Sequence, residues 1–482
     1  MLFSSVPFLF YFLPAALLIY FAAPRQLKNA VLLLASLFFY AWGEPKYMLL
    51  MLVSIVQGYG FGLLIEKHRG QKASKVFLTL SILVSLGLLG YFKYADFFLS
   101  SVNAVTGLSL PLLKLSLPIG ISFYTFQVLS YVIDVYRGET AAQRNFIDLA
   151  AYVSLFPQLI AGPIVRYSDV AAELKSRTHS VSAAAEGVRR FTVGFAKKIL
   201  LANQFGALAS AYKSTQDASV LFVWLYALAF LLQVYFDFSG YSDMAIGLGR
   251  MLGFHFPENF NYPYISASIT EFWRRWHMSL GSWFRDYLYI PLGGNRVSKT
   301  KWLRNILIVW LLTGLWHGAD WRYLAWGLFT GLLAAFGVMT ARARQRINRY
   351  NPLYRMGWFK VFWQCLFTNA LFCLTLVFFA SAIYNTDPFA VYGSLLQGWD
   401  GLTGSWAQVS NLIYSSGIDG RLPVVLLFGC FVVFAAEHKG RSVARWIRQQ
   451  VWPLRWTLYY GMAAAILFFA AFGQSAFIYQ QY

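Results

Sequence analysis

The chain has 482 residues, of which 58% are hydrophobic and only 12% are charged, and its formal net charge is +20. A soluble domain carries about 25% charged residues, so this composition excludes an ordinary soluble globular protein. The basic residues lie in short loops between apolar segments, which argues against nucleic-acid binding and indicates contact with membrane lipid. We therefore predict a polytopic membrane protein.

Apolar segments follow one another along the whole chain, and no hydrophilic stretch is long enough to form a separate domain. A membrane-spanning helix needs about 20 predominantly apolar residues. We expect one all-α membrane domain over 1–482, with roughly eleven to thirteen transmembrane or re-entrant helices. The first run has no basic segment before it, which predicts a membrane span rather than a cleaved signal. The runs cover about 5–23, 28–42, 47–65, 77–92, 117–136, 146–165, 190–212, 219–237, 241–254, 304–316, 321–340, 359–384, 422–436 and 456–473.

The distribution of Lys and Arg predicts the orientation in the membrane. Basic loops occur at 67–75, 296–304, 342–349 and 439–455, and such loops are typical of the cytoplasmic side. The segment that carries Asp387, Asp400 and Asp419 has little positive charge and is expected outside. The last span then runs outwards, so the tail 473–482 is predicted on the extracytoplasmic side or inside an opening on that side. The first loop, with Arg25 and Lys28, is expected in the cytoplasm, which places the N-terminus outside.

The segment 268–295 is too polar for contact with lipid and too aromatic for a solvated loop. Polar backbone at membrane depth is tolerated where it lines a cavity. We interpret the segment as amphipathic or re-entrant helices around an internal cavity on the cytoplasmic side. An interfacial helix with an aromatic belt is the alternative. Its charged residues are Glu271, Arg274, Arg275, Arg285 and Asp286.

Two histidines lie in apolar, aromatic surroundings. His317 belongs to the run 311–321, and His277 follows Arg274 and Arg275 forty residues upstream. An ionisable side chain at membrane depth indicates a functional site, and imidazole transfers protons near neutral pH. The alternative is a histidine that only bonds a neighbouring helix. Gly314 and Gly318 beside His317 would permit close approach of a helix or a ligand.

The acidic and cysteine residues show no metal-binding spacing. The pattern includes neither HExxH nor CxxC, so we predict no metal site, and Cys365, Cys373 and Cys430 are interpreted as buried structural residues. Asp237 and Asp243 lie six residues apart in an apolar stretch. They either hold helices together or line the cavity.

Several longer motifs resemble the membrane-bound O-acyltransferase family, and most closely its bacterial branch that O-acetylates polysaccharides. The resemblance covers about residues 1–335 and implies a helical bundle around a central tunnel. In this family a thioester donor enters from the cytoplasm and the acceptor enters from the opposite side. The matching stretches are LPIGISFY (117–124), LIAGP (159–163), YFDFSGYSDMA (235–245), ENFNYPYI (258–265), ITEFWRRWH (269–277), RDYLYIPLGGNR (285–296) and GLWHG (314–318).

The resemblance also implies roles for residues of a catalytic core segment at 268–317. His317 corresponds to the essential histidine of the family and His277 to its second histidine. With acetyl-CoA as the donor, Arg274, Arg275, Trp276 and Asn259 are expected to bind this cofactor. The resemblance further implies a multi-pass protein of the bacterial cytoplasmic (inner) membrane and a periplasmic or surface-anchored partner that resembles SGNH hydrolases. The acceptor is expected to be a polysaccharide, first an alginate-like one, with cellulose, peptidoglycan and teichoic acid as alternatives.

The C-terminal tail ends in FIYQQY, which resembles the Phe-x-Tyr-x-x-Phe ending of a small partner protein in the D-alanylation branch of the family. Tyr479 occupies the position of the acyl-accepting tyrosine, while Tyr482 replaces the final Phe. A phenol has a pKa near 10 and a thiol one near 8.5, so a tyrosyl ester would keep much of the transfer potential of a thioester. Tyr479 is therefore expected to relay the acetyl group. The alternative is an aromatic anchor at the membrane interface.

Two other classes of function remain open. A transporter of a polysaccharide precursor or acyl donor would also use embedded histidines as proton relays, although the sequence shows no repeated halves. A scaffold for a secretion complex would tolerate the loss of both histidines. The sequence favours a membrane O-acetyltransferase.

Overall fold

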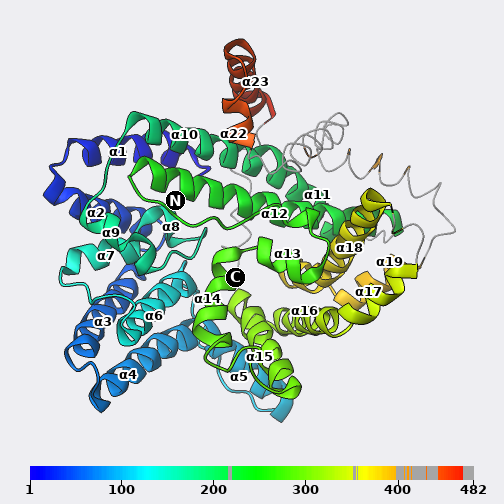
Figure 1. Cartoon of the computed structure of the whole chain (residues 1–482), viewed down its shortest axis with the longest axis horizontal. Helices are drawn as coiled ribbons and strands as arrows, with labels where there is room; N and C mark the ends of the chain where they lie inside the picture. Colours follow the sequence, from blue (N-terminus) through cyan, green and yellow to red (C-terminus); the bar gives the residue numbers. More distant parts are fainter. Residues whose placement is uncertain are drawn as a thin grey trace.

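The structure is a computed structural model that describes residues 1–214, 220–350, 354, 356–397, 407, 410, 411, 414, 430 and 443–469. Within these residues every regular element is a helix and there is no strand, which confirms the all-α prediction. Figure 1 shows two short helices, α13 (Ile269–Arg275) and α14 (Met278–Phe284), near the middle of the molecule with longer helices around them. The segment that the sequence marks as unusual therefore lies centrally.

The N-terminal part consists of short and medium helices rather than of one span for each apolar run. The run 146–165 is divided at Leu155, whose ψ of 111° is not helical, and Pro157 follows in the first turn of the next helix. Proline favours such a first turn and disfavours a helix interior. The elements are η1 (Pro7–Phe12), α1 (Leu13–Ala22), η2 (Arg25–Leu27), α2 (Lys28–Ala41), α3 (Met48–Lys67), α4 (Lys72–Leu89), η3 (Gly90–Tyr94), α5 (Ala95–Thr106), α6 (Ile121–Arg137), α7 (Phe146–Ser154), α8 (Phe156–Leu159) and α9 (Tyr167–Lys175).

Two long helices, α10 (Val181–Ala196) and α12 (Val220–Met251), pack closely against each other, with η4 (Lys197–Ala202) and α11 (Asn203–Ser214) following α10. The contact depends on glycines seven residues apart in each helix. A Cβ atom on Gly187 would overlap the carbonyl oxygen of Gly247, and one on Gly194 would overlap that of Gly240. Small residues permit this approach of two backbones within a membrane. We call this contact the glycine seam.

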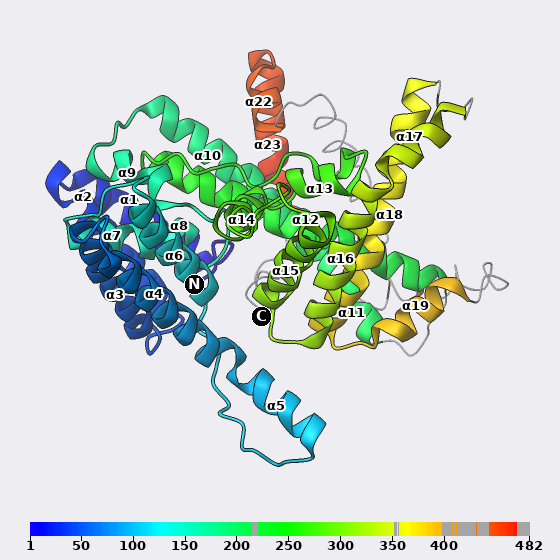
Figure 2. The ribbon, with the colours of Figure 1, turned by 60° about the horizontal axis from the view of Figure 1, so that its bottom comes forward.

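The C-terminal part contains the remaining long helices and several basic surface elements. Figure 2 shows α17 at the top of the molecule and α5 at the bottom, on opposite sides. The elements are η5 (Pro263–Ile265), α13, α14, η6 (Arg285–Tyr289), α15 (Lys299–His317), α16 (Trp321–Met339), α17 (Ala341–Tyr350), α18 (Gly357–Tyr384), α19 (Pro388–Leu396), α22 (Val443–Arg448) and α23 (Trp452–Phe469).

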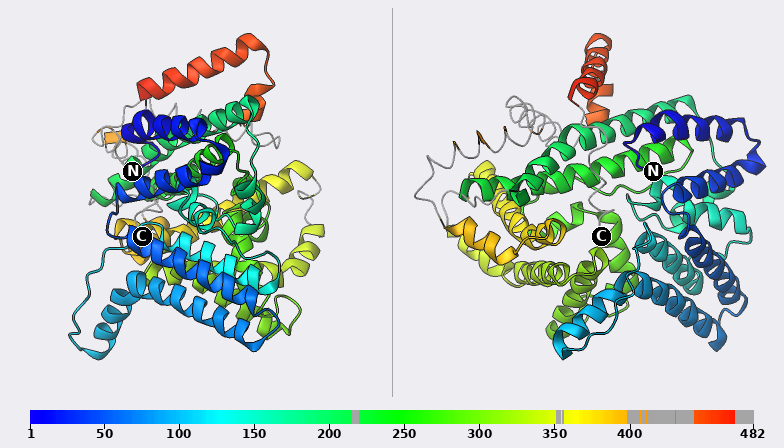
Figure 3. Two further views of the ribbon diagram at one scale, coloured as in Figure 1. Left: turned by 90° about the vertical axis from the view of Figure 1, so that its left-hand side faces the viewer. Right: turned by 180° about the vertical axis from the view of Figure 1, so that it is seen from behind.

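Five helical stretches of the described chain are long and apolar enough to cross a membrane by themselves: α3, Lys72–Thr106, α12, α16 and α18. The apolar runs at 219–237 and 241–254 form the single helix α12 rather than two elements. In the left panel of Figure 3, α23 (red) lies at the top of the molecule, apart from the blue helices α3 and α4 in its lower half.

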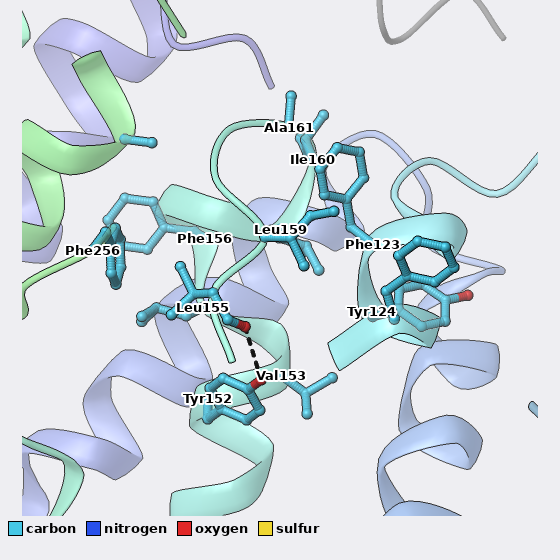
Figure 4. Packing of buried hydrophobic residues seen from close by; sticks show 14 of the residues in the cluster. Phe123, Tyr124, Tyr152, Val153, Leu155, Phe156, Leu159, Ile160, Ala161 and Phe256 are labelled. Atoms are coloured by element: carbon cyan, nitrogen blue, oxygen red, sulfur yellow. Dashed lines mark hydrogen bonds between the residues drawn. The ribbon is translucent and has the colours of Figure 1, made fainter. Parts of the chain in front are cut away.

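The largest buried cluster joins residues from the N-terminus to the middle of the chain. Phe3 stacks on Tyr241 of α12 with 4.7 Å between ring centroids. Figure 4 shows the part of this cluster around Phe156, where Leu159, the last residue of α8, lies between Phe156 and Phe123 of α6. Trp316, at the end of α15, belongs to the same cluster. The N-terminal helices therefore pack continuously up to the segment that carries His317.

Candidate active site

His317 is the last residue of α15, and its side chain is buried. The following Gly318 is extended, so the helix ends at the histidine. Three aromatic rings surround the imidazole, at centroid distances of 4.9 Å for Trp316, 5.1 Å for Trp326 and 5.1 Å for Phe379. These rings come from α15, α16 and α18. The structure therefore places the predicted histidine in a cage formed by three helices.

Glycines bring α16 close to the end of α15. A Cβ atom on Gly314 would overlap the carbonyl oxygen of Tyr323, and one on Gly318 would overlap the ring of Tyr323. On α16, a Cβ atom on Gly327 would overlap the carbonyl oxygen of Trp310. The two glycines beside His317 thus serve helix packing, which holds Trp326 against the imidazole.

A lysine and a tyrosine from η3 hold the last turn of α15. Lys93 Nζ donates a hydrogen bond to the carbonyl oxygen of Trp316 and one of 3.2 Å to Ser122 Oγ. Tyr94 Oη donates to the carbonyl oxygen of Leu315 at 2.8 Å. The last carbonyl groups of a helix lack partners within the helix, and a cation is favourable there. We call this pair the η3 clamp.

The η3 clamp was not predicted from the sequence. Lys93 stands at the end of an apolar run, and a lysine at membrane depth is itself a sign of function. Its partner lies 223 residues further along the chain, and no local pattern indicates such a contact.

His277 lies between α13 and α14 with a left-handed backbone, φ 44° and ψ 54°. Such a conformation costs a non-glycine residue about 1–3 kcal/mol and often marks a functional site. The buried imidazole hydrogen-bonds through Nδ1 to Asn259 Oδ1 at 3.0 Å. Asn259 Nδ2 donates to Ser242 Oγ of α12 at 3.0 Å.

The surroundings of Asn259 determine which nitrogen of His277 carries the proton. The backbone N–H of Ser279 points at Asn259 Oδ1 at 3.3 Å, and the Ser279 hydroxyl donates to the same oxygen at 2.8 Å. A backbone N–H only donates, so this atom of Asn259 is the acceptor oxygen. His277 Nδ1 must then be the donor, and in the neutral imidazole the lone pair lies on Nε2.

The two histidines lie on either side of one tryptophan. The ring of Trp316 is 4.9 Å from that of His317 and 5.8 Å from that of His277, centroid to centroid. The chain between the two histidines forms α14, η6 and α15, and it folds back to bring them together. The structure therefore unites the two histidines and Asn259 in one buried site.

The residues expected to bind the donor lie in three different environments. Arg274 is exposed on α13 and has no ion pair among the described residues. Arg275 pairs with Glu271 at 2.9 Å, and its Nη1 donates to the carbonyl oxygen of Asn261. Trp276 is buried among aromatic rings, including that of Phe260 at 5.0 Å. Asn259 is a partner of His277 rather than part of a surface near these arginines.

Asp237 and Asp243 bind basic residues across the glycine seam. Asp237 pairs with Lys198, and both side chains are almost fully buried. Asp243 pairs with Lys197 at 3.0 Å and with Arg190 at 2.9 Å. These contacts favour the interpretation that the aspartates hold helices together.

The predicted acyl-accepting residue Tyr479 and the tail 473–482 lie outside the described residues. Within the described part of the chain, no three His, Cys, Asp or Glu side chains are placed to share a metal ion.

A cavity of about 300 Å³ lies beyond the C-terminal end of α15. It is lined by residues that include Lys93, Asp96, Asp320 and Tyr323. Burial alone raises the pKa of Asp320, but hydrogen bonds from Arg322 hold it below its ordinary value. The carboxylate is therefore charged and pairs with Arg322 at 2.7 Å. The lining residue Asp96 belongs to α5, which lies on the side of the molecule opposite to the basic helix α17 (Figure 2).

A buried pair of histidines within an all-helical membrane bundle is suited to proton transfer at membrane depth, and the comparisons with known proteins identify the class of enzyme. The profile of the MBOAT, membrane-bound O-acyltransferase family, matches residues 139–378. The chain belongs to this family, which confirms the predictions of an acyltransferase and of a multi-pass membrane protein.

Curated relatives cover most of the chain. It is 49% identical to the probable alginate O-acetylase AlgI of Pseudomonas aeruginosa, over 73% of this chain and 69% of the relative. It is 50% identical to the probable alginate O-acetylase AlgI of Azotobacter vinelandii, over 69% and 67%. The peptidoglycan O-acetyltransferase of Helicobacter pylori is 38% identical over 69% of each chain.

Proposed function

We propose that this acyltransferase moves acetyl groups from cytoplasmic acetyl-CoA to the outer side of the membrane for O-acetylation of an alginate-like polysaccharide. The observation that carries the proposal is the buried His277–Trp316–His317 group, with an imidazole on each side of one indole. The names of the relatives support acetyl as the group and alginate as the first choice of acceptor. Peptidoglycan is the alternative acceptor, because one relative acts on it.

In the proposed reaction His317 is the general base. Its imidazole accepts the proton of the attacking hydroxyl while the hydroxyl oxygen forms a bond to the thioester carbon. The C–S bond then breaks, and His317 returns the proton to the leaving thiolate. His277, with its lone pair on Nε2, assists by accepting a hydrogen bond from the substrate or the imidazolium. The aromatic cage excludes water and so protects the thioester from hydrolysis.

The two sides of the bundle support separate entry of donor and acceptor. Arg274 on α13 remains our candidate for the phosphates of acetyl-CoA, because it is exposed and a guanidinium binds phosphate well. Arg275 and Trp276 support this region by packing, and Asn259 acts as a positioning residue for His277. The cavity beside Asp320, on the opposite side, would admit the acceptor.

We further propose that Tyr479 accepts the acetyl group first and passes it to the acceptor pathway outside. The proposal rests on the motif FIYQQY, which ends the sequence. A periplasmic or surface-anchored partner of the SGNH-hydrolase type would then complete transfer to the polysaccharide. A long polysaccharide cannot easily reach a histidine buried in the membrane domain. Transfer through Tyr479 and then through a partner protein would carry the acetyl group to the polymer.

The testing experiment is incubation of the purified protein with labelled acetyl-CoA, followed by intact-mass and peptide analysis. We expect label on Tyr479 in the wild type, none in Tyr479→Phe, and no release of CoA by His317→Ala at normal membrane levels. Release of CoA without a protein adduct would support the acetyltransferase activity and would overturn the proposal that Tyr479 carries the acetyl group. Acetyl transfer by His317→Ala at the wild-type rate would overturn the catalytic assignment.

A further inference from the structure

Two indole N–H groups beside His317 have no hydrogen-bond partner among the described residues. They belong to Trp316 and Trp326, which are only 5% and 3% exposed. An indole nitrogen is a donor only, and a buried donor without an acceptor is unfavourable. Buried polar groups of this kind are rare in folded proteins, and a role in catalysis is one reason for which a protein keeps them.

Both indoles are in direct contact with the catalytic imidazole. Their ring centroids lie 4.9 and 5.1 Å from that of His317, and each ring stands edge-on to it at 80° and 89°. They come from different helices, α15 and α16, which the glycine contacts around Tyr323 hold together. The two donors are therefore fixed relative to the base and to each other.

The acyl-transfer reaction requires donors at this place. A general base acts on a hydroxyl about 3 Å away, and the carbonyl carbon under attack lies directly beyond that hydroxyl. The carbonyl oxygen therefore lies within a few ångströms of the imidazole, inside the same aromatic cage. Lys93 also lies nearby, but its Nζ donates to the carbonyl oxygen of Trp316 and to Ser122 Oγ, and we assign it to the support of α15.

We propose that the indole N–H groups of Trp316 and Trp326 bind the thioester carbonyl oxygen and stabilise the oxyanion that forms on it. The inference rests on the proposed function and adds residues to it. As the hydroxyl oxygen bonds to the carbonyl carbon, His317 takes its proton and the π electron pair moves to the oxygen, between the two indoles. When that pair returns, the C–S bond breaks and the thiolate takes the proton from His317.

The surroundings make these donors effective. The cage consists of aromatic side chains, including Phe379, in which a hydrogen bond to an anion is much stronger than in water. Trp273 and Trp224 also have buried N–H groups without a described partner, but neither has a ring contact with His317 among the described residues. Proximity to the base thus distinguishes Trp316 and Trp326, and Trp224 provides a matched control.

The test is steady-state acetyl transfer by the full-length protein with Trp316→Phe, Trp326→Phe and Trp224→Phe. Removal of one oxyanion donor lowers kcat by about 10²–10³-fold. We expect that loss for the first two variants, with KM for acetyl-CoA within about threefold of wild type, because the contact strengthens in the transition state. Trp224→Phe should keep the wild-type kcat.

A shape-preserving variant separates catalysis from packing. The benzothiophene analogue of tryptophan keeps the fused ring but lacks the N–H, and it can be placed at 316 or 326 by codon reassignment. A loss of kcat in these folded proteins supports the proposal, and wild-type kcat in both overturns it. In the same assay, His317→Ala tests the proposed function separately. If His317→Ala is inactive while the tryptophan variants are fully active, the role of the indole donors is overturned and the proposed acetyl transfer stands.

Discussion

At the scale of single side chains, Asn259 is the residue whose role differs most from its sequence-based interpretation. Its oxygen accepts hydrogen bonds from His277 and Ser279, and its nitrogen donates to Ser242. Outer partners of this kind fix the orientation and the tautomer of an imidazole. Asn259 therefore links α12 to the catalytic core segment through hydrogen bonds alone.

Replacement of Asn259 by leucine keeps the size of the side chain and removes the acceptor. We expect kcat to fall by about 10²-fold, the typical magnitude of one acid–base contribution. Asn259→Asp, which still accepts from Nδ1–H, should retain more activity. The control is Asn103→Leu, since the Asn103 side chain hydrogen-bonds the backbone of Leu110 near the end of α5. Equal rates for Asn259→Leu and wild type, measured with labelled acetyl-CoA, would contradict this role.

The η3 clamp offers a second test at the residue scale. Lys93→Met removes the donor to the last turn of α15, and a misplacement of about 1 Å at a reacting group costs about 10²-fold in rate. We therefore expect kcat to fall by up to that amount while KM for acetyl-CoA stays unchanged. Lys93→Arg should recover part of the loss, and Lys75→Met on the exposed first turn of α4 should be neutral. A change confined to KM would show that Lys93 serves donor binding instead.

At the scale of helices, the glycine seam and the ion pairs across it explain why α12 is continuous. The polar residues that interrupt its sequence pattern, Asp237 and Asp243, bind Lys198, Lys197 and Arg190 of the neighbouring segment. Hydrogen-bonded carboxylates are tolerated in a membrane helix that faces protein. Two apolar runs in the sequence thus become one helix.

The glycine seam predicts a position-dependent effect of added methyl groups. Gly194→Ala should destabilise the protein by about 1–3 kcal/mol, because its Cβ would overlap the carbonyl oxygen of Gly240. Gly87→Ala in α4 meets no atom within 4 Å and should be neutral or stabilising. Thermal unfolding in detergent micelles measures both, and equal midpoints for the two variants would contradict the seam.

The buried pair of Lys198 and Asp237 gives a second prediction for the same helices. Its side chains are 3% and 2% exposed, so Asp237→Asn would leave a buried ammonium without this carboxylate. We expect a loss of about 3–5 kcal/mol. The double variant Lys198→Met with Asp237→Leu removes both charges and should recover much of that loss. A double variant as unstable as Asp237→Asn would speak against the charge as the cause.

At the scale of the whole molecule, the basic loops predict which side faces the cytoplasm, and cysteine labelling can test this orientation. Figure 2 shows α17, which carries Arg342 to Arg349, on the side opposite to the end of α5. Val105 at that end is 87% exposed. We expect Val105→Cys, in a parent without native cysteines, to react with an impermeant maleimide in intact spheroplasts. Arg346→Cys should react only after permeabilisation, and the reverse pattern would invert the orientation.

The sequence predicted the parts of the architecture and site that depend on local composition. The all-helical class follows from apolar runs, and His277 and His317 are recognisable because an imidazole in such a run is costly. The contacts across the fold were not predictable, since Lys93 and Trp316 or Asn259 and Ser242 share no local pattern. The division at Leu155 and the continuity of α12 also depend on tertiary packing.

The position of His317 in the chain has a consequence for the newly synthesised protein. Its cage is completed by Trp326 and by Phe379 of α18, while η3 near the N-terminus holds its last turn. A nascent chain that has only just inserted 317 residues therefore holds both histidines and Trp316 but lacks Trp326 and Phe379. The cage around His317 is complete only after α18 has been synthesised, so the surroundings of the imidazole depend on chain that follows it by about sixty residues.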